Sequence, residues 1–346
     1  MIRKIKSKIN RFRKHLLPAA IYKSRFLSSL YYFLVISSFS REHQAVLAGK
    51  VKHLRDTQRS KDNYFLLIRN IHRLEKGLLM RPKREIFAKD YIKETIECFE
   101  GVWNNESYHQ PNNLQMKWFY DVLSNYFSSS GEDKLITSLS ERFTKITEGN
   151  KFEIQSNKSR PYFRPEKTTI SYEDFFELTR IRRSVRWFLE KPVPRELIDK
   201  AIQAAIQSPS ACNRQPFEYR VIDDRSMVEK VVNFPMGTKG YAYNIPVVIV
   251  AIGNLDAYFD ERDRHLIYID SSLANMALML SLETLGLSSC PINWPDIEAR
   301  EIMMDEFLSL ERYQRPIMCI GVGFPDPEGM VAFSEKRSLD QIRKYN

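Results

Sequence analysis

The sequence has few cysteines, and they are not grouped. Its 346 residues contain four of them, Cys98, Cys212, Cys290 and Cys319, with no CxxC pair and no histidine at metal-ligand spacing. This scatter argues against a zinc site and against a disulfide framework. Reduced thiols are typical of cytosolic proteins, so we expect a cytoplasmic protein.

Long apolar runs are also lacking. Residues 26–39 are apolar but interrupted by four serines, and their 14 positions fall short of the roughly 20 that cross a bilayer. No small-residue cleavage site follows them. Residues 1–25 hold nine Lys/Arg and no acidic residue. Two interpretations of residues 1–40 stay open. One is a basic helix packed on the protein; the other is an interfacial segment in peripheral contact with an anionic membrane or polyanion.

The positive charge is confined to one half of the chain. The net charge is +10, of which residues 1–165 carry +15 and residues 166–346 carry −5. Any anionic partner surface is therefore expected in the N-terminal half, without specific nucleic-acid recognition. Hydrophobic residues make up 43% of the chain, which suffices for a sizeable core.

The hydrophobic pattern divides the chain into a helical part and a mixed part. Apolar residues recur at three- and four-residue steps within residues 60–100, with Gly77 and Pro82 as breaks. Helices are expected in this stretch and after it, up to a linker. We therefore expect residues 1–165 to form a basic, all-helical region. From residue 166 the pattern predicts alternating helices and strands. The predicted helices of the first part are 84–99, 114–127 and 133–147, with a linker over 149–169; the predicted strands of the second are 217–222, 246–252, 287–292 and 316–321.

Two polar segments in the second part are typical of a ligand site. Arg182, Arg183, Ser184 and Arg186 suit a phosphate, because guanidinium binds oxyanions bidentately. The alternative is a solvated basic turn. The pair Lys336 and Arg337 could complete the same site, or could be a solvated tail.

The second segment, residues 208–217, places small and amide side chains between two prolines. Its polar residues suit a flat heterocycle with many hydrogen-bonding edges; the alternative is a rigid connector whose side chains cap backbone groups. Cys212 has no histidine near it in sequence, so we interpret it as a packed thiol.

Two further patterns could have a function, but each also has a structural interpretation. His72 and Glu75 share a helix face and could do acid–base chemistry, but a solvated helix end closed by Gly77 explains them as well. Small residues along 270–277 form a stripe that is more typical of a core or a dimer interface than of an active site.

The order of these motifs resembles the FMN-dependent nitroreductase family. Arg-Arg-Ser-x-Arg-x-Phe (182–188), Ser-Pro-Ser-x-x-Asn-x-Gln-Pro-Phe (208–217), a Val/Ile strand, Cys-Pro-Ile-Asn (290–293) and Ile-Gly-Val-Gly-Phe-Pro (320–325) follow that family's sequence order. The resemblance covers roughly residues 171–340. It implies an α+β fold, with a central, mostly antiparallel sheet flanked by helices, in residues 166–346. It also implies a homodimer with FMN at the interface.

The resemblance also implies roles for particular residues. Arg182, Arg183, Ser184 and Arg186 would hold the phosphate and the pyrimidine edge, and Lys336 and Arg337 would complete the phosphate site. From the other subunit, the contacts would be Pro209, Ser210, Asn213 and Gln215. Backbone around Pro291, Ile292 and Asn293 would lie over the isoalloxazine.

The expected activity is ping-pong hydride transfer from NADH or NADPH through FMN to a nitroaromatic, quinone or related acceptor, with no catalytic side chain. One alternative is a specialised flavin-dependent step on a biosynthetic intermediate. Another is a non-catalytic flavin-binding module recruited by its basic N-terminus to membrane or polyanion. The chain departs from many relatives at Phe217 and at Trp294-Pro295, where a bulky ring could narrow the substrate pocket.

Overall fold

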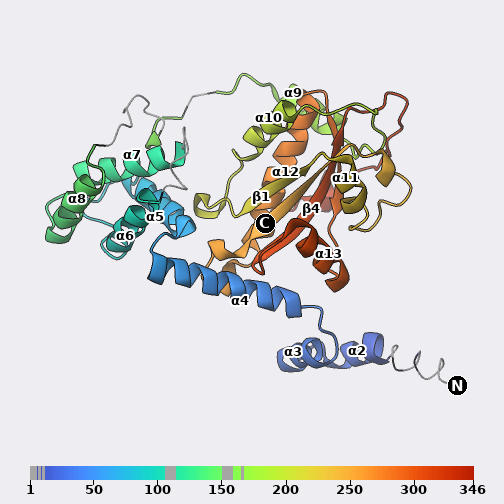
Figure 1. The fold of residues 1–346 in the computed structure, drawn as a ribbon, viewed down its shortest axis with the longest axis horizontal. Helices are drawn as coiled ribbons and strands as arrows, with labels where there is room; N and C mark the ends of the chain where they lie inside the picture. Colours follow the sequence, from blue (N-terminus) through green and yellow to red (C-terminus); the bar gives the residue numbers. More distant parts are fainter. Residues whose placement is uncertain (1–5, 7–8, 10–11, 106–113, 150–158, 165–166) are drawn as a thin grey trace.

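The computed structural model describes residues 6, 9, 12–105, 114–149, 159–164 and 167–346. It consists of N-terminal helices, a helical module and a mixed α and β domain (Figure 1). The predicted α+β class, with a helical region before it, is confirmed. Residues 150–158 and 165–166 of the predicted linker lie outside the described part, so the domain boundary at 165/166 stays a prediction.

The first described helices lead into one long helix. They are α2 (Leu17–Ile21), α3 (Arg25–Leu34) and α4 (Ser40–Arg55), with a short π-helical turn, η1 (Phe12–Leu16), before them. Figure 1 shows α2 and α3 beyond one end of α4, while α4 itself runs along the lower edge of the mixed domain. Within the described residues, no helix is both long and apolar enough to cross a membrane.

The helical module has its own hydrophobic core. Its helices are α5 (Tyr64–Leu78), α6 (Ile92–Trp103), α7 (Leu114–Ser128) and α8 (Lys134–Ile146). Phe99, Phe119 and Tyr126 are fully buried between them. Asn63 and Asp133 cap two of the helices by accepting hydrogen bonds from backbone N–H groups of the first turn.

The predicted helix over residues 84–99 is wrong in its first half. Residues 84–91 form turns and α6 begins only at Ile92. The ring of Phe87 packs so closely on Gly77 of α5 that a Cβ there would lie 2.1 Å from it. The carbonyl of Phe87 also accepts a 2.8 Å hydrogen bond from Tyr126. These tertiary contacts outweigh the local helix propensity.

The mixed domain is built on a four-stranded antiparallel sheet in the order β1-β2-β4-β3. The strands are β1 (Phe217–Ile222), β2 (Val247–Asn254), β3 (Ser288–Asn293) and β4 (Gln314–Gly323). Every residue of β2 is buried, because helices cover both faces of the sheet.

Alternate residues of β2 point to two separate cores. Val247 and Ile249 pack with α10 (Arg195–Ala205) and α12 (Leu266–Thr284). Val248 and Val250 pack with α11 (Arg225–Val231) and α13 (Glu298–Leu308). This alternation follows from the two-residue period of a strand. Figure 1 shows α10 and α12 together at one side of the sheet.

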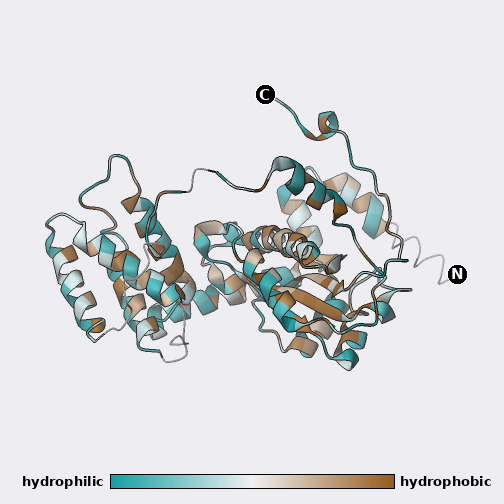
Figure 2. Ribbon diagram, turned by 90° about the horizontal axis from the view of Figure 1, so that it is seen from above, coloured by the Kyte–Doolittle hydropathy of each residue, from teal (hydrophilic) through white to brown (hydrophobic). Residues whose placement is uncertain are grey.

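The remaining elements lie at the ends of the domain. Helix α9 (Tyr172–Ile181) is capped by Ser171, whose hydroxyl accepts a hydrogen bond from the N–H of Asp174. No residue of α9 is buried. The last helix, α14 (Leu339–Ile342), lies in a C-terminal segment that extends away from the domain (Figure 2).

Candidate functional site

The basic segment 182–186 lies along strand β3. It follows α9 in an extended conformation, and Ser184 forms a parallel bridge with Ser289. The N–H of Val185 donates a 3.0 Å hydrogen bond to the carbonyl of Ser289. The strand then continues through Pro291, Ile292 and Asn293. The structure therefore brings two of the predicted site segments together within one chain.

Polar atoms in this region lack partners. Arg182 Nε and Ser289 Oγ are buried, and neither has a hydrogen-bond partner among the described residues. The guanidinium of Arg186 lies 5.5 Å from the ring centre of Tyr241. An unsatisfied buried donor is costly, so a ligand with acceptor atoms fits here. FMN, with a phosphate and carbonyl oxygens, is such a ligand.

The loop 208–217 is held by the carboxylate of Asp270. Oδ2 of Asp270 accepts hydrogen bonds from Ser210 Oγ at 2.7 Å and from the N–H of Ala211 at 2.9 Å. Ser210 Oγ in turn accepts from the N–H of Gln215. Helix α12 begins at Leu266 and carries Asp270 on its buried face.

Strained backbone concentrates in the same loop. Cys212, Asn213 and Gln215 all have positive φ, at 54°, 56° and 50°. Non-glycine residues in this region cost on the order of 1–3 kcal/mol each and tend to cluster where ligands bind. Pro209 is exposed at the start of the loop, and the amide of Gln215 donates to the side chain of Asn213 at 3.2 Å. The strained backbone is a further feature typical of a ligand-binding loop, and the sequence pattern did not reveal it.

The two predicted site segments lie at opposite ends of the sheet. Ser289, beside the basic segment, pairs with Val322, which pairs with Val247 at the start of β2. Phe217, at the end of the loop, pairs with Gly253 near the end of β2. Six residues of strand separate these positions, about 20 Å at 3.3 Å per residue. One chain therefore does not bring Arg182–Arg186 and Pro209–Gln215 together around a single small ligand.

Lys336 and Arg337 lie in the exposed C-terminal segment. The N–H of Lys336 donates to its neighbour Glu335, and Arg337 donates to the carbonyl of Gln341. Figure 2 shows this segment extending outward from the domain. The structure thus does not bring this pair to the other predicted residues within one chain.

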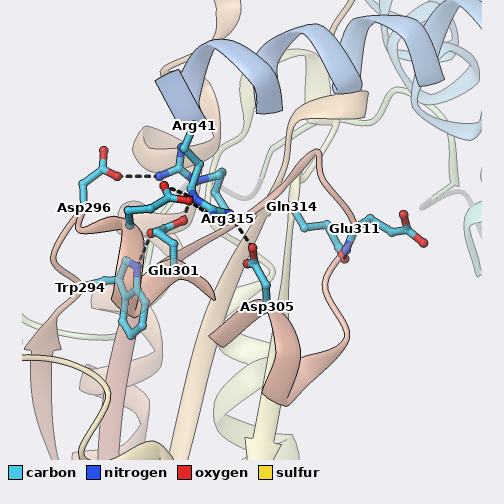
Figure 3. A network of polar contacts seen from close by, with 9 residues as sticks. Arg41, Trp294, Asp296, Glu301, Asp305, Glu311, Gln314 and Arg315 are labelled. Carbon is cyan, nitrogen blue, oxygen red and sulfur yellow. Dashed lines mark hydrogen bonds and ion pairs between the residues drawn. The ribbon is translucent and has the colours of Figure 1, made fainter. Parts of the chain in front are cut away.

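The ring of Trp294, which from the sequence could have narrowed the substrate pocket, is buried. Its indole N–H donates a 2.6 Å hydrogen bond to Oε1 of Glu301, and Oε2 of Glu301 accepts from Arg315 at 3.1 Å. Arg315 also pairs with Asp296 at 3.0 Å (Figure 3). Burial raises the pKa of Glu301, and the Arg315 charge opposes that rise. This network fixes the chain just after Asn293.

Helices α4 and α5, from the N-terminal half of the chain, both contact the mixed domain. Arg41 of α4 forms ion pairs at 2.6 Å with Glu298 and Asp305 of α13 (Figure 3). These pairs raise the pKa of Arg41 and lower that of Glu298. Helix α5 packs on the loop at η5 (Ala211–Asn213). More than 250 residues separate Arg41 from its partners, so no sequence spacing could have revealed them.

Comparisons with known proteins match the C-terminal half of the chain. The model of the nitroreductase family matches residues 179–236 and 228–324. A protein of Methanothermobacter thermautotrophicus named "Putative NADH dehydrogenase/NAD(P)H nitroreductase" is 27% identical over 157 residues, 45% of this chain and 80% of that protein. Human iodotyrosine deiodinase 1 is 25% identical over 211 residues, 51% of this chain and 71% of that protein.

Solved structures are similar over the same half. A Clostridium difficile structure named as an FMN-dependent nitroreductase has a TM-score of 0.43 and 22% identity, covering 49% of this chain and 99% of that one. By its match to the family model and to the curated relatives, the C-terminal half is an oxidoreductase domain. It belongs to the nitroreductase family, as the order of motifs predicted.

Proposed function

We propose that the protein is an FMN-dependent oxidoreductase that takes hydride from NADH or NADPH and reduces a nitroaromatic, quinone or related acceptor. The observation that carries this proposal is the pair of buried, unpartnered polar atoms, Arg182 Nε and Ser289 Oγ, between the basic segment and β3. Flavin phosphate and pyrimidine oxygens would satisfy such donors.

Each part of the proposed site has a distinct task. Arg182, Arg183, Ser184 and Arg186 would hold the phosphate and the pyrimidine edge, with Lys336 and Arg337 closing the phosphate site. Backbone at Pro291, Ile292 and Asn293 would lie over the ring, held in place by the buried Trp294–Glu301 hydrogen bond. When bound, FMN would supply the hydride chemistry. Nearby guanidiniums would stabilise negative charge that develops on it.

The proposed site needs two subunits. Pro209, Ser210, Asn213 and Gln215 would come from the partner subunit, because one chain holds them at the far end of the sheet. The exposed face of α12 supports a dimer. Ile269, Leu273 and Met276 form an apolar stripe along it and are all at least 39% exposed.

Mixed dimers test this arrangement. One chain carries Arg182→Ala and Arg186→Ala, and the other carries Asn213→Ala and Gln215→Ala. In a shared site, the mixed dimer has one site with both defects and one fully intact site. We expect it to bind one FMN per dimer, while both parent homodimers bind none tightly. If the mixed dimer binds no more FMN than the parents, the site lies within a single chain.

A second candidate keeps the chemistry but changes the substrate. The specialised redox step on a biosynthetic intermediate is favoured by α5, which packs directly on the proposed flavin loop at η5. Relatives with this domain include proteins named iodotyrosine deiodinase, so acceptors within the family differ. Steady-state reduction of a generic quinone compared with that of candidate intermediates would separate the two.

We also propose that α3 contacts an anionic membrane surface. Phe26 and Phe33 are 74% and 78% exposed, and Leu27, Leu30 and Leu34 are exposed near them. Lys14, Lys23 and Arg25 lie in the same stretch. Apolar and basic side chains together suit a headgroup region.

A further inference from the structure

Helix α5 brings basic side chains to the loop that is proposed to reach the flavin. Arg69 lies 5.7 Å from the ring centre of Phe259, and Arg214 lies 4.7 Å from that of Tyr258. Arg214 directly follows η5, on which α5 packs, and its charge acts on that of Arg69, so the two guanidiniums lie near the contact between α5 and η5. Arg73 follows Arg69 by one helical turn and stacks 3.6 Å from the ring centre of Tyr91.

These positive charges are poorly neutralised. Within the part of the chain that the structure describes, Arg69 and Arg214 have no ion-pair partner. Arg73 donates to Asn70 Oδ1 at 3.5 Å, and the one carboxylate that pairs with it among the described residues is that of Asp90, at 3.6 Å and 77% exposed. Burial lowers the pKa of Arg69, and the charges of Arg73 and Arg214 lower it further. By contrast, the buried guanidinium of Arg315 is held by two carboxylates.

Two buried polar atoms in the same place also lack partners. Arg214 is 4% exposed, and its Nε has no hydrogen-bond partner in the described structure. The ring of Tyr258 lies under the Arg214 guanidinium, and its buried hydroxyl also has no hydrogen-bond partner among the described residues. Unsatisfied donors and unpaired charge at one point are costly without a ligand. An oxyanion would satisfy both, since guanidinium binds carboxylate and phosphate through paired hydrogen bonds.

We propose that Arg69, Arg73 and Arg214 form an oxyanion site that binds a carboxylate or phosphate group of the acceptor. This inference rests on the proposed function, because it is the flavin contact of Asn213 and Gln215 that places the site next to the reacting ring. The helical module then selects the substrate: α5 favours anionic acceptors over neutral ones of the same shape.

A matched pair of acceptors tests the site in the full-length, flavin-loaded protein. The acceptors are 4-nitrobenzoate and 4-nitrobenzyl alcohol, which differ in charge. In the variant Arg69→Gln/Arg73→Gln we expect kcat/KM for the benzoate to fall by about tenfold or more, as for the loss of charge-assisted hydrogen bonds. The value for the alcohol should stay unchanged. The control variant Arg59→Gln/Lys76→Gln removes the same charge from exposed positions nearby and should leave both values unchanged.

A second measurement does not need turnover. Inorganic phosphate or benzoate, exchanged for chloride at constant ionic strength, should raise the Tm of the flavin-loaded wild type and of the control, and should raise that of Arg69→Gln/Arg73→Gln much less. An equal rise in all three proteins overturns the site. Phosphate could raise the Tm only when the arginines are present, while the variant keeps the wild-type preference between the two acceptors. That result would mean that the site binds a free anion, and it would overturn the assignment to the acceptor. If neither NADH nor NADPH reduces the flavin of the wild type, the proposed function fails, whereas the thermal shift still decides whether the anion site exists.

Discussion

The indole nitrogen of Trp294 and Oε1 of Glu301 are 2.6 Å apart in a fully buried hydrogen bond. Glu301 uses its other oxygen to accept from Arg315 of β4. The chain just after Asn293 is thereby tied to α13 and to the sheet. Arg41 of α4 forms ion pairs with the same helix, α13. Helix α13 therefore contacts both α4 and the chain next to the proposed flavin region.

Removal of Glu301 should be far more damaging than removal of its neighbour Glu298. Glu301→Ala takes the buried carboxylate from Arg315, which is 3% exposed, and leaves its ion pair with the largely exposed Asp296. We expect it to lower the free energy of unfolding by about 3–5 kcal/mol. Glu298→Ala breaks an exposed pair with Arg41 and should cost less than about 1 kcal/mol. Urea denaturation measures both, and equal losses would contradict the role given to this network.

A methyl group at Gly77 should be poorly tolerated. A Cβ there meets the ring of Phe87 at 2.1 Å, so Gly77→Ala should destabilise the helical module by about 1–3 kcal/mol. The double variant Gly77→Ala/Phe87→Leu should recover part of this loss, because the smaller side chain makes room. Thermal unfolding compares the two; an absence of recovery would mean that helix-end geometry, not packing, requires the glycine.

Asp256 should make stability depend on pH. Burial raises its pKa to about 6, and Oδ1 has no partner within the described structure. A carboxyl group with a raised folded-state pKa stabilises most below its unfolded pKa of about 3.8, and that contribution is lost as pH rises through 6.

Asp256→Asn should therefore raise the free energy of unfolding at pH 7.5 by about 1–2 kcal/mol, less than the roughly 3 kcal/mol of a full two-unit shift. The gain should shrink as the pH is lowered toward 4. Paired denaturation curves at the two pH values give the answer, and a gain independent of pH would rule out titration of Asp256 as its cause.

The apolar face of α3 should direct vesicle binding. Phe26→Ser/Phe33→Ser should weaken sedimentation with vesicles of mixed phosphatidylserine and phosphatidylcholine, because the inserted area is lost. Added salt should weaken the wild type too, since basic residues contribute. Tyr172→Ser/Phe175→Ser, with exposed rings on α9, is the control and should bind as wild type does. Binding that survives in the α3 variant would contradict the surface assignment.

Much of the fold could be predicted from local patterns. The strand prediction 217–222 matches β1 at both ends, because residues that alternate or run apolar between turn residues have few other conformations. Gly286, just after the end of α12, has a positive φ of 73°, the conformation for which glycine is common beyond a helix end. The failure at residues 84–91 has a tertiary cause, the packing of Phe87 on Gly77.

The candidate site was only partly accessible to sequence reasoning. Arg182–Arg186 and residues 208–217 could be singled out because their side chains are chemically unusual for a connector. Arg41, Arg69 and Arg315 could not, since a single arginine in a helix or strand has no local pattern and acquires its partners only through the fold. The separation of the two segments across the sheet likewise depends on strand register, which no short motif records.

Anaerobic titration of the purified protein with NADH and with NADPH tests the central claim most directly. We expect a yellow protein that contains FMN and whose visible absorbance bleaches with one equivalent of reductant per flavin, then returns when an acceptor is added. A protein that neither retains nor binds added FMN, or whose flavin absorbance is unchanged by either nicotinamide, would contradict the account.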